Sequence, residues 1–192
     1  MAESIVIKFY SQVNEGSIGR LLKAVDVKLA SGVEQFTLLI STSGGSVFHG
    51  FTACNYLKGI PAEVTTHQIG SVDSIGVALY CAGKRRLCVP QARFLMHPVS
   101  MNFRDGASYE EPKLLELVKS LRVDMDNCAS IVAANTNRTK KQVLRAMLAR
   151  TTLHPEAALE WVSRTRSASS SSRTAAKLSR SRPAADRRHP VR

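Results

Sequence analysis

A chain of 192 residues, of which 44% are hydrophobic and 22% charged, is long enough for one domain with a sizeable core and too short to favour two. Its formal net charge of +12 would indicate a nucleic-acid partner if it covered a folded surface. Residues 163–192, however, carry eight Arg and one Lys against one Asp, so +8 of the charge lies there and +4 remains for residues 1–162.

Hydropathy and cysteine usage exclude further classes of protein. No apolar run approaches the roughly 20 residues that cross a bilayer, and the amino-terminal segment lacks the pattern of a signal peptide, so we expect a soluble cytoplasmic protein with no membrane partner. The four cysteines have neither the paired spacing of a zinc site nor the density of a disulfide framework. We therefore predict reduced thiols, no metal and no cofactor.

The first half of the chain predicts repeated β-α units. Alternating or continuous apolar runs favour strands at 4–10, 36–40 and 62–69, and helical periodicity follows at 18–29, 47–57 and 74–82. Turn residues separate each strand from its helix, at 14–17, 41–46 and 70–73. This alternation indicates an α/β fold with a mainly parallel sheet flanked by helices.

The second half begins with two short strands, at 86–89 and 93–97, and continues with helices. Apolar residues recur at helical spacing from Tyr109 to Ala134, with an interruption expected near Pro112. A helix of that length spans nearly 40 Å, which is longer than a compact domain needs, so part of it is expected to project towards a neighbouring subunit. Shorter helices are predicted at 140–149, after the cap Thr139, and at 155–162.

Composition divides the chain at Val162. Residues 1–162 form the predicted globular domain, and residues 163–192 are rich in Ser and Arg with few large aliphatic side chains. Such a segment buries too little apolar surface to offset its ordering entropy, so we predict a disordered basic tail. The alternative is a basic arm that binds nucleic acid or another acidic surface, and a nucleic-acid partner is expected only through this tail.

Two segments carry residues suited to serine hydrolysis, which needs a hydroxyl, an imidazole, a group that holds the imidazole, and N–H donors for an oxyanion. Ser74 lies between a strand end and the expected first turn of a helix, with glycines on both sides. Local sequence alone equally fits a helix N-cap, and it leaves Ser71 as a competing nucleophile. His97 ends the last predicted strand, where a histidine is often structural.

The glycine pair Gly44-Gly45 follows the most apolar strand and precedes a helix, so its backbone N–H groups could face a ligand. The Lys-Ser or Lys-Thr pair of a phosphate-binding loop does not follow it, which argues against nucleotide binding.

In order along the chain, these segments resemble the proteolytic subunit of Clp protease. That family has a strand ending in Asn-Ser-Pro-Gly-Gly, a nucleophile in Gly-x-Ala-x-Ser-Met-Gly and a base in Arg-x-Met-x-His-Gln-Pro, and similar stretches occur here at 40–47, 70–76 and 90–97. The resemblance implies a Clp/crotonase-like fold in which the long helix belongs to the handle that interlocks rings. It also implies Ser74 as nucleophile, His97 as base, the N–H groups of Gly45 and Ile75 as oxyanion hole, and Gly44 as support for that loop.

The sequence departs from the family at the position of the triad aspartate, which falls on Arg150. A cation cannot hold the imidazole N–H, and loss of the acid in a related triad costs about 10⁴ in turnover. Asp73, Asp124, Asp126 or a water could replace it, and the sequence does not choose among them. The family's amino-terminal segment, which helps to dock the ATPase partner, has no counterpart before Ser4, so coupling to an AAA+ ATPase is in doubt.

The leading interpretation is a self-assembling serine endopeptidase that cleaves peptides or unfolded proteins through an acyl-enzyme inside a homo-oligomeric chamber. The alternative is a catalytically weak or inactive structural subunit of such a ring, which Arg150 favours. A third reading, a crotonase-like acyl-CoA enzyme, accounts for the Gly-Gly loop but gives Ser74 and His97 no role.

Overall fold

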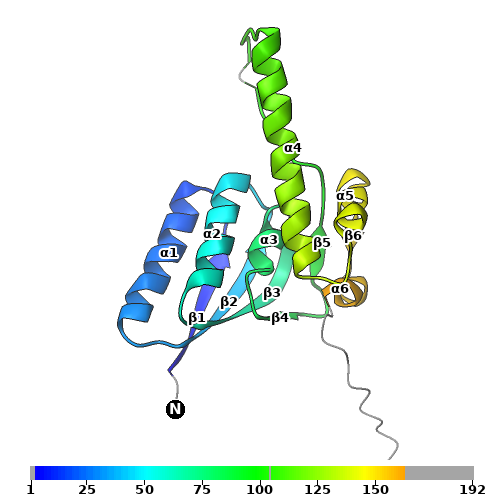
Figure 1. Cartoon of the computed structure of the whole chain (residues 1–192). Coiled ribbons are helices and arrows are strands. Elements are labelled where there is room, and N and C mark those ends of the chain that lie inside the picture. Colours follow the sequence, from blue (N-terminus) through cyan, green and yellow to red (C-terminus); the bar gives the residue numbers. More distant parts are fainter. Residues whose placement is uncertain (1–2, 104, 163–192) are drawn as a thin grey trace, which may run out of the picture.

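A computed structural model describes residues 3–103 and 105–162 of the chain, so the predicted tail at 163–192 lies outside the described residues. The described part is an α/β domain in which a sheet is packed against helices and one long helix projects from the body (Figure 1). None of the described helices combines the length and apolar character needed to cross a membrane.

The predicted β-α alternation is confirmed. The strands are β1 (Ser4–Tyr10), β2 (Gln35–Thr42), β3 (Glu63–Asp73), β4 (Arg85–Cys88), β5 (Arg93–Leu95) and β6 (Thr152–Leu153). The helices are α1 (Glu15–Ala30), α2 (Val47–Gly59), α3 (Gly76–Tyr80), α4 (Glu111–Ala134), α5 (Lys140–Leu148) and α6 (Pro155–Val162).

The sheet has the strand order β1-β2-β3-β5-β6, and β4 also pairs with β3. All pairings are parallel except that of β5 with β6, where Phe94 lies opposite Leu153 and Leu95 opposite Thr152. The short antiparallel β6 was not predicted, because two residues are too few to produce a period-2 pattern. β3 is central: it pairs with β4 through residues 65–68 and with β5 through residues 71–73.

Local signals explain where the helices begin. Asn14 and Ser17 form a reciprocal capping box, so α1 starts three residues earlier than its apolar periodicity predicts. Thr139 and Gln142 form a second capping box at α5, as the cap prediction required. Pro112 lies in the first turn of α4, where its missing N–H breaks no hydrogen bond, so the interruption expected there is wrong.

The core lies between the sheet and helices α1, α2 and α3, which stand side by side in Figure 1. In β2 buried residues alternate with half-buried ones, so one face of that strand points into the core. The buried apolar side chains at the centre include Ile40, Leu79 and Ile75.

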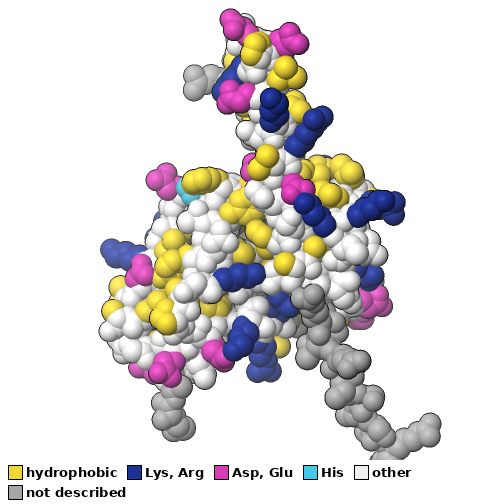
Figure 2. All heavy atoms as spheres, viewed as in Figure 1, with side chains coloured by type: hydrophobic (Ala, Val, Ile, Leu, Met, Phe, Trp, Pro, Cys, Tyr) yellow, Lys and Arg dark blue, Asp and Glu magenta, His cyan; other side chains and the backbone are white. Residues whose placement is uncertain are grey.

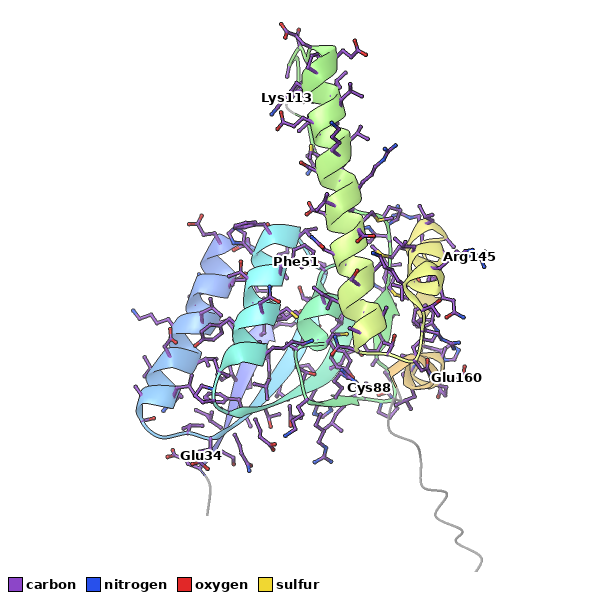
Figure 3. The ribbon with its side chains drawn as sticks, in the orientation of Figure 1. Glu34, Phe51, Cys88, Lys113, Arg145 and Glu160 are labelled. Carbon is purple, nitrogen blue, oxygen red and sulfur yellow. The ribbon has the colours of Figure 1, made fainter. Side chains whose placement is uncertain are left out.

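The amino-terminal part of α4 rises well clear of the body, and Lys113 lies near its far end (Figures 1 and 3). Its buried residues, Cys128, Ala129 and Val132, all lie in the carboxyl-terminal third. Figure 2 shows hydrophobic side chains among acidic and basic ones along the projecting part. Exposed apolar residues there include Leu114, Leu115, Val118 and Val123.

Candidate active site

Ser74 lies in a tight turn between the end of β3 and α3. Its φ is +58°, which is the left-handed region that non-glycine residues rarely adopt. Its N–H donates to the carbonyl of Leu95 (2.7 Å), and its carbonyl accepts from the N–H of Val77 (3.0 Å). Ser74 thus lies between a strand and a helix as expected, but the helix predicted from position 74 begins only at Gly76, because β3 continues through Asp73.

The left-handed backbone of Ser74 is held in place by hydrogen bonds to the neighbouring segments, β5 and the start of α3. A left-handed non-glycine residue costs about 1–3 kcal/mol and persists only where the surrounding structure holds it. Here the parallel pairing of Asp73 with Leu95 continues directly into the hydrogen bond from Ser74 to β5. The N-cap of α3 is Ile75, and it has no side-chain cap, so Ser74 does not serve as the cap that local sequence suggested.

His97 follows β5 by two residues and is half-buried. The N–H of Met96 donates to the carbonyl of Thr151 (2.9 Å), the residue directly before β6. The Nδ1 atom of His97 lies 2.7 Å from the carbonyl oxygen of Pro98. A carbonyl only accepts, so this contact places the imidazole proton on Nδ1 and leaves the lone pair on Nε2 available to a proton.

The Gly44-Gly45 loop leads from β2 towards Ser74. Gly44 has a φ of +85°, and a Cβ added to it would lie 2.6 Å from Cβ of Ser74 and 2.8 Å from the carbonyl oxygen of Asp73. Gly45 has a φ of +143°, and a Cβ there would lie 2.3 Å from the carbonyl oxygen of Val13. Both positions therefore need glycine, because the loop passes between Val13 and the turn of Ser74.

The N–H groups of Gly45 and Ile75 have no hydrogen-bond acceptor within residues 3–103 and 105–162. Val13 forms a parallel bridge with Gly45, using the carbonyl of Gly44 (2.8 Å) and the N–H of Ser46 (2.8 Å). In a parallel bridge the peptide groups of the central residue face the other way, so the N–H of Gly45 points away from Val13. Both N–H groups are therefore free to donate to a ligand.

Ser74 and His97 line the same hollow in the surface, together with Ile75. The structure thus brings these predicted residues into one cavity, and Gly44 contacts the Ser74 turn from the side. The rest of the wall is almost wholly apolar and comes from α2, α3, the segment after β5, α4 and α5. Its residues are Val47, Val77, Ala78, Met96, Val99, Cys128, Val132, Val143 and Met147.

Comparison with known proteins identifies the family of this chain. A family model described as Clp protease matches residues 1–161. The chain belongs to the Clp protease family. An ATP-dependent Clp protease proteolytic subunit 3 from Rhizobium etli is 30% identical over 115 residues, and a proteolytic subunit from Deinococcus radiodurans is 28% identical over 130 residues.

The matches to these Clp relatives cover 59% and 67% of this chain, and 59% and 62% of the relatives' own lengths. Among solved structures, a point mutant of ClpP1 from Listeria monocytogenes has a TM-score of 0.73. It is 18% identical in sequence, and the match covers 81% of this chain and 85% of that one. At this identity the likeness shows the fold, and it confirms the predicted Clp-like α/β architecture.

No carboxylate contacts His97 among residues 3–103 and 105–162, and its Nδ1 atom lies against the carbonyl of Pro98 instead. Arg150 is exposed, adopts a φ of +52° and donates its N–H to the carbonyl of Met147 (3.0 Å). The carboxylate of Asp73 accepts from Ser71 and Arg93, and that of Asp126 pairs with Lys140.

Ser71, which local sequence left as a competing nucleophile, is engaged on both sides. Its Oγ donates to the Asp73 carboxylate (2.7 Å) and lies 3.1 Å from the Nη2 atom of Arg93. The Ser71 hydroxyl is therefore held by Asp73 and Arg93, whereas Ser74 lies in the wall of the cavity described above.

Cys128 lies in the cavity wall and was not among the predicted site residues. Burial, followed by the nearby Asp124, raises the pKa of its thiol to about 12. All four cysteines are free thiols, and no group of three His, Cys, Asp or Glu side chains within the described ranges could hold a metal ion. The periodic apolar face of the long helix was the sequence signal for the cavity wall, but periodicity does not say what such a face packs against.

Proposed function

We propose that this chain is a serine peptidase subunit in which Ser74 is the nucleophile and His97 the general base. The observation that carries the proposal is that β3 and β5, joined by the Ser74-to-Leu95 hydrogen bond, deliver both residues to one cavity. The family match supports it. The chain spans about three fifths of the length of the curated relatives in the matches described above.

In the proposed reaction, Nε2 of His97 takes the proton of Ser74 Oγ as Oγ attacks the carbonyl carbon of a peptide bond. The N–H groups of Gly45 and Ile75 donate to the oxyanion that forms, and Gly44 keeps the loop close enough for this. His97 then gives the proton to the leaving amine, and an acyl-enzyme remains on Ser74. Water, deprotonated by His97, hydrolyses the ester and restores the hydroxyl.

Assembly into rings is part of the proposal. The projecting half of α4 exposes apolar side chains that nothing else in the described chain covers, and such surfaces commonly mark protein interfaces. A homo-oligomer would bury them and enclose the cavity in a chamber for peptides or unfolded proteins. Light scattering of the purified chain measures the assembly directly. An AAA+ ATPase partner is proposed only from the family, and co-sedimentation with an ATPase of that class would test it.

A fluorophosphonate probe, followed by peptide mapping, tests the nucleophile. We expect label on Ser74, and we expect His97→Ala to reduce its rate at least a hundredfold, within the usual contribution of a general base. Thr65→Ala is the matched control, since it removes a hydroxyl of the same strand at a distance from the nucleophile turn and should leave labelling within a few fold. Label that disappears with Ser71→Ala and persists in Ser74→Ala would refute the assignment.

A catalytically weak or inactive ring subunit is the second candidate, and Arg150 favours it. A cation at the position of the acid cannot stabilise the imidazolium form of His97. An inactive subunit predicts a well-folded oligomer in which Ser74 takes no label. The probe experiment therefore decides between the two.

A further inference from the structure

Three polar side chains link β3 to β5 immediately before the nucleophile. Ser71 lies opposite Arg93 in the parallel register, and Asp73 lies opposite Leu95. Arg93 donates from Nη2 to the Asp73 carboxylate (2.7 Å) and to Ser71 Oγ (3.1 Å), and Ser71 Oγ donates to the other Asp73 oxygen (2.7 Å). The three groups form a closed triangle of hydrogen bonds across two strands.

The burial of the triangle is unequal. The side chain of Asp73 is 9% exposed, whereas that of Arg93 is 55% exposed. The carboxylate has therefore lost most of its water and depends on Arg93 and Ser71, while the guanidinium keeps contact with solvent. The buried Asp73 carboxylate is therefore held in one geometry more firmly than a carboxylate in an exposed ion pair. Salt and side-chain entropy weaken an exposed pair.

The triangle also lies where the strand pairing changes. β3 is paired with β4 up to Gln68 and with β5 from Ser71 onwards. The buried amide of Gln68 bridges the interval, donating to the carbonyls of Gly70 (3.1 Å) and Arg93 (2.5 Å). Gln68 and Arg93 thus hold the start of β5 against β3 at the place where the backbone ladder is interrupted.

We propose that Asp73 is a positioning residue that holds Ser74 in its reactive conformation, an inference that rests on the proposed function. Asp73 directly precedes the left-handed Ser74, and its own carbonyl oxygen lies against Gly44. The carboxylate fixes the end of β3 to β5, and His97 leaves β5 two residues later. Without this tie the end of β3 can shift, Ser74 can relax towards an ordinary φ, and Oγ moves from its place in the cavity that it shares with His97.

Four variants test the role: Asp73→Ala, Asp73→Asn, Arg93→Ala and the double variant Asp73→Ala/Arg93→Ala. The readout is Ser74 acylation by a fluorophosphonate over a range of probe concentrations, per folded protein. We expect Asp73→Ala to lower the limiting rate at least tenfold with little change in the half-saturating concentration, because Asp73 does not line the cavity. Asp73→Asn keeps an acceptor oxygen and should recover part of the rate.

The double variant should be no slower than the slower single variant, since both changes break one triangle and such effects do not add. Glu63→Ala is the matched control: it breaks the ion pair with Lys84 at the other end of β3 and should leave the rate unchanged. A fall in thermal stability with an unchanged rate per folded protein would show a structural role only, and would overturn the proposal.

Amide hydrogen exchange at Ser74 gives a second readout that needs no activity. The Ser74 N–H donates to Leu95, so Asp73→Ala should speed its exchange at least tenfold while amides at 65–68 keep their protection. If the unaltered chain takes no label but exchange responds, the proposed function fails and the positioning device stands. If Ser74 keeps its protection in Asp73→Ala, the device itself is refuted.

Discussion

Replacing Gly44 with alanine tests whether the Gly-Gly loop and the nucleophile turn fit together as described. The added Cβ would lie 2.6 Å from Cβ of Ser74, 2.8 Å from the carbonyl oxygen of Asp73 and 3.3 Å from Oγ of Ser74. Distances below 3.0 Å between such atoms require something to move. Since Gly44 is buried and Asp73 is tied to β5, we expect the Ser74 turn to be displaced.

Two costs combine at Gly44. An L-residue at a φ near +85° costs about 1–2 kcal/mol relative to glycine. Overlap in a packed region adds about 1–3 kcal/mol. We therefore expect Gly44→Ala to lower the free energy of unfolding by about 2–5 kcal/mol, and to slow acylation of Ser74 at least a hundredfold through misplacement of Oγ.

Gly32→Ala is the control for the backbone cost alone. Gly32 has a φ of +88°, almost the value at Gly44, and a Cβ there would meet nothing within 4 Å. Gly32→Ala should lower the free energy of unfolding by about 1–2 kcal/mol and leave the rate of Ser74 acylation per folded protein unchanged. Urea unfolding at one protomer concentration, with fluorophosphonate labelling of the same samples, measures both quantities. Equal losses of stability and equal labelling rates in the two variants would refute the described contact between Gly44 and Ser74.

Two further predictions concern Arg150 and the buried thiols. Arg150→Asp should raise peptide hydrolysis at least tenfold, because aspartate tolerates the left-handed backbone there and restores a carboxylate at the family's acid position. Arg150→Asn fits the same backbone but carries no charge, so it should leave the rate of peptide hydrolysis unchanged. Equal rates in the two variants would contradict the reasoning. Burial raises the pKa values of Cys81 and Cys128 from the ordinary 9.0 to about 12, so at pH 8 their thiolate fractions fall about a thousandfold and iodoacetamide should modify them only after unfolding. Modification of these thiols in the native chain at pH 8 at the rate seen after unfolding would refute their burial. The same pKa shifts mean that the folded chain keeps thiol protons which the unfolded chain releases above about pH 9, so the free energy of unfolding should fall as pH rises from 9 towards 12.

Much of the fold could be predicted because its signals are local. The strand at Ser4–Tyr10 alternates cleanly, and the cap at Thr139 and the proline at Pro155 mark the starts of α5 and α6 at the predicted residues. The third strand was predicted to end at position 69, whereas β3 continues to Asp73, and the difference has a physical cause. Gly70 and Asp73 have turn-forming character, yet β5 supplies hydrogen-bond partners that extend the strand through them.

The candidate site could be predicted only in part. Ordered motifs indicated Ser74, His97 and the Gly-Gly pair, and the structure places Ser74 and His97 in one cavity with Gly44 against the turn. The part of the cavity wall that α4 and α5 contribute depends on packing between segments distant in the sequence, and no local pattern encodes such packing. The left-handed backbone at Ser74 was also missed, because serine, unlike glycine, gives no sequence signal for a positive φ.

The contact between His97 and Pro98 separates two tasks that a triad aspartate performs together. The Pro98 carbonyl holds Nδ1–H at 2.7 Å and so fixes the tautomer, but a neutral acceptor stabilises an imidazolium much less than a carboxylate does. Attack on a fluorophosphonate releases fluoride and needs no proton from His97, whereas cleavage of a peptide needs the imidazolium to protonate the amine. On the proposed mechanism, Ser74 should therefore be labelled readily while peptides turn over slowly, and a carboxylate at position 150 should raise peptide turnover more than it raises labelling.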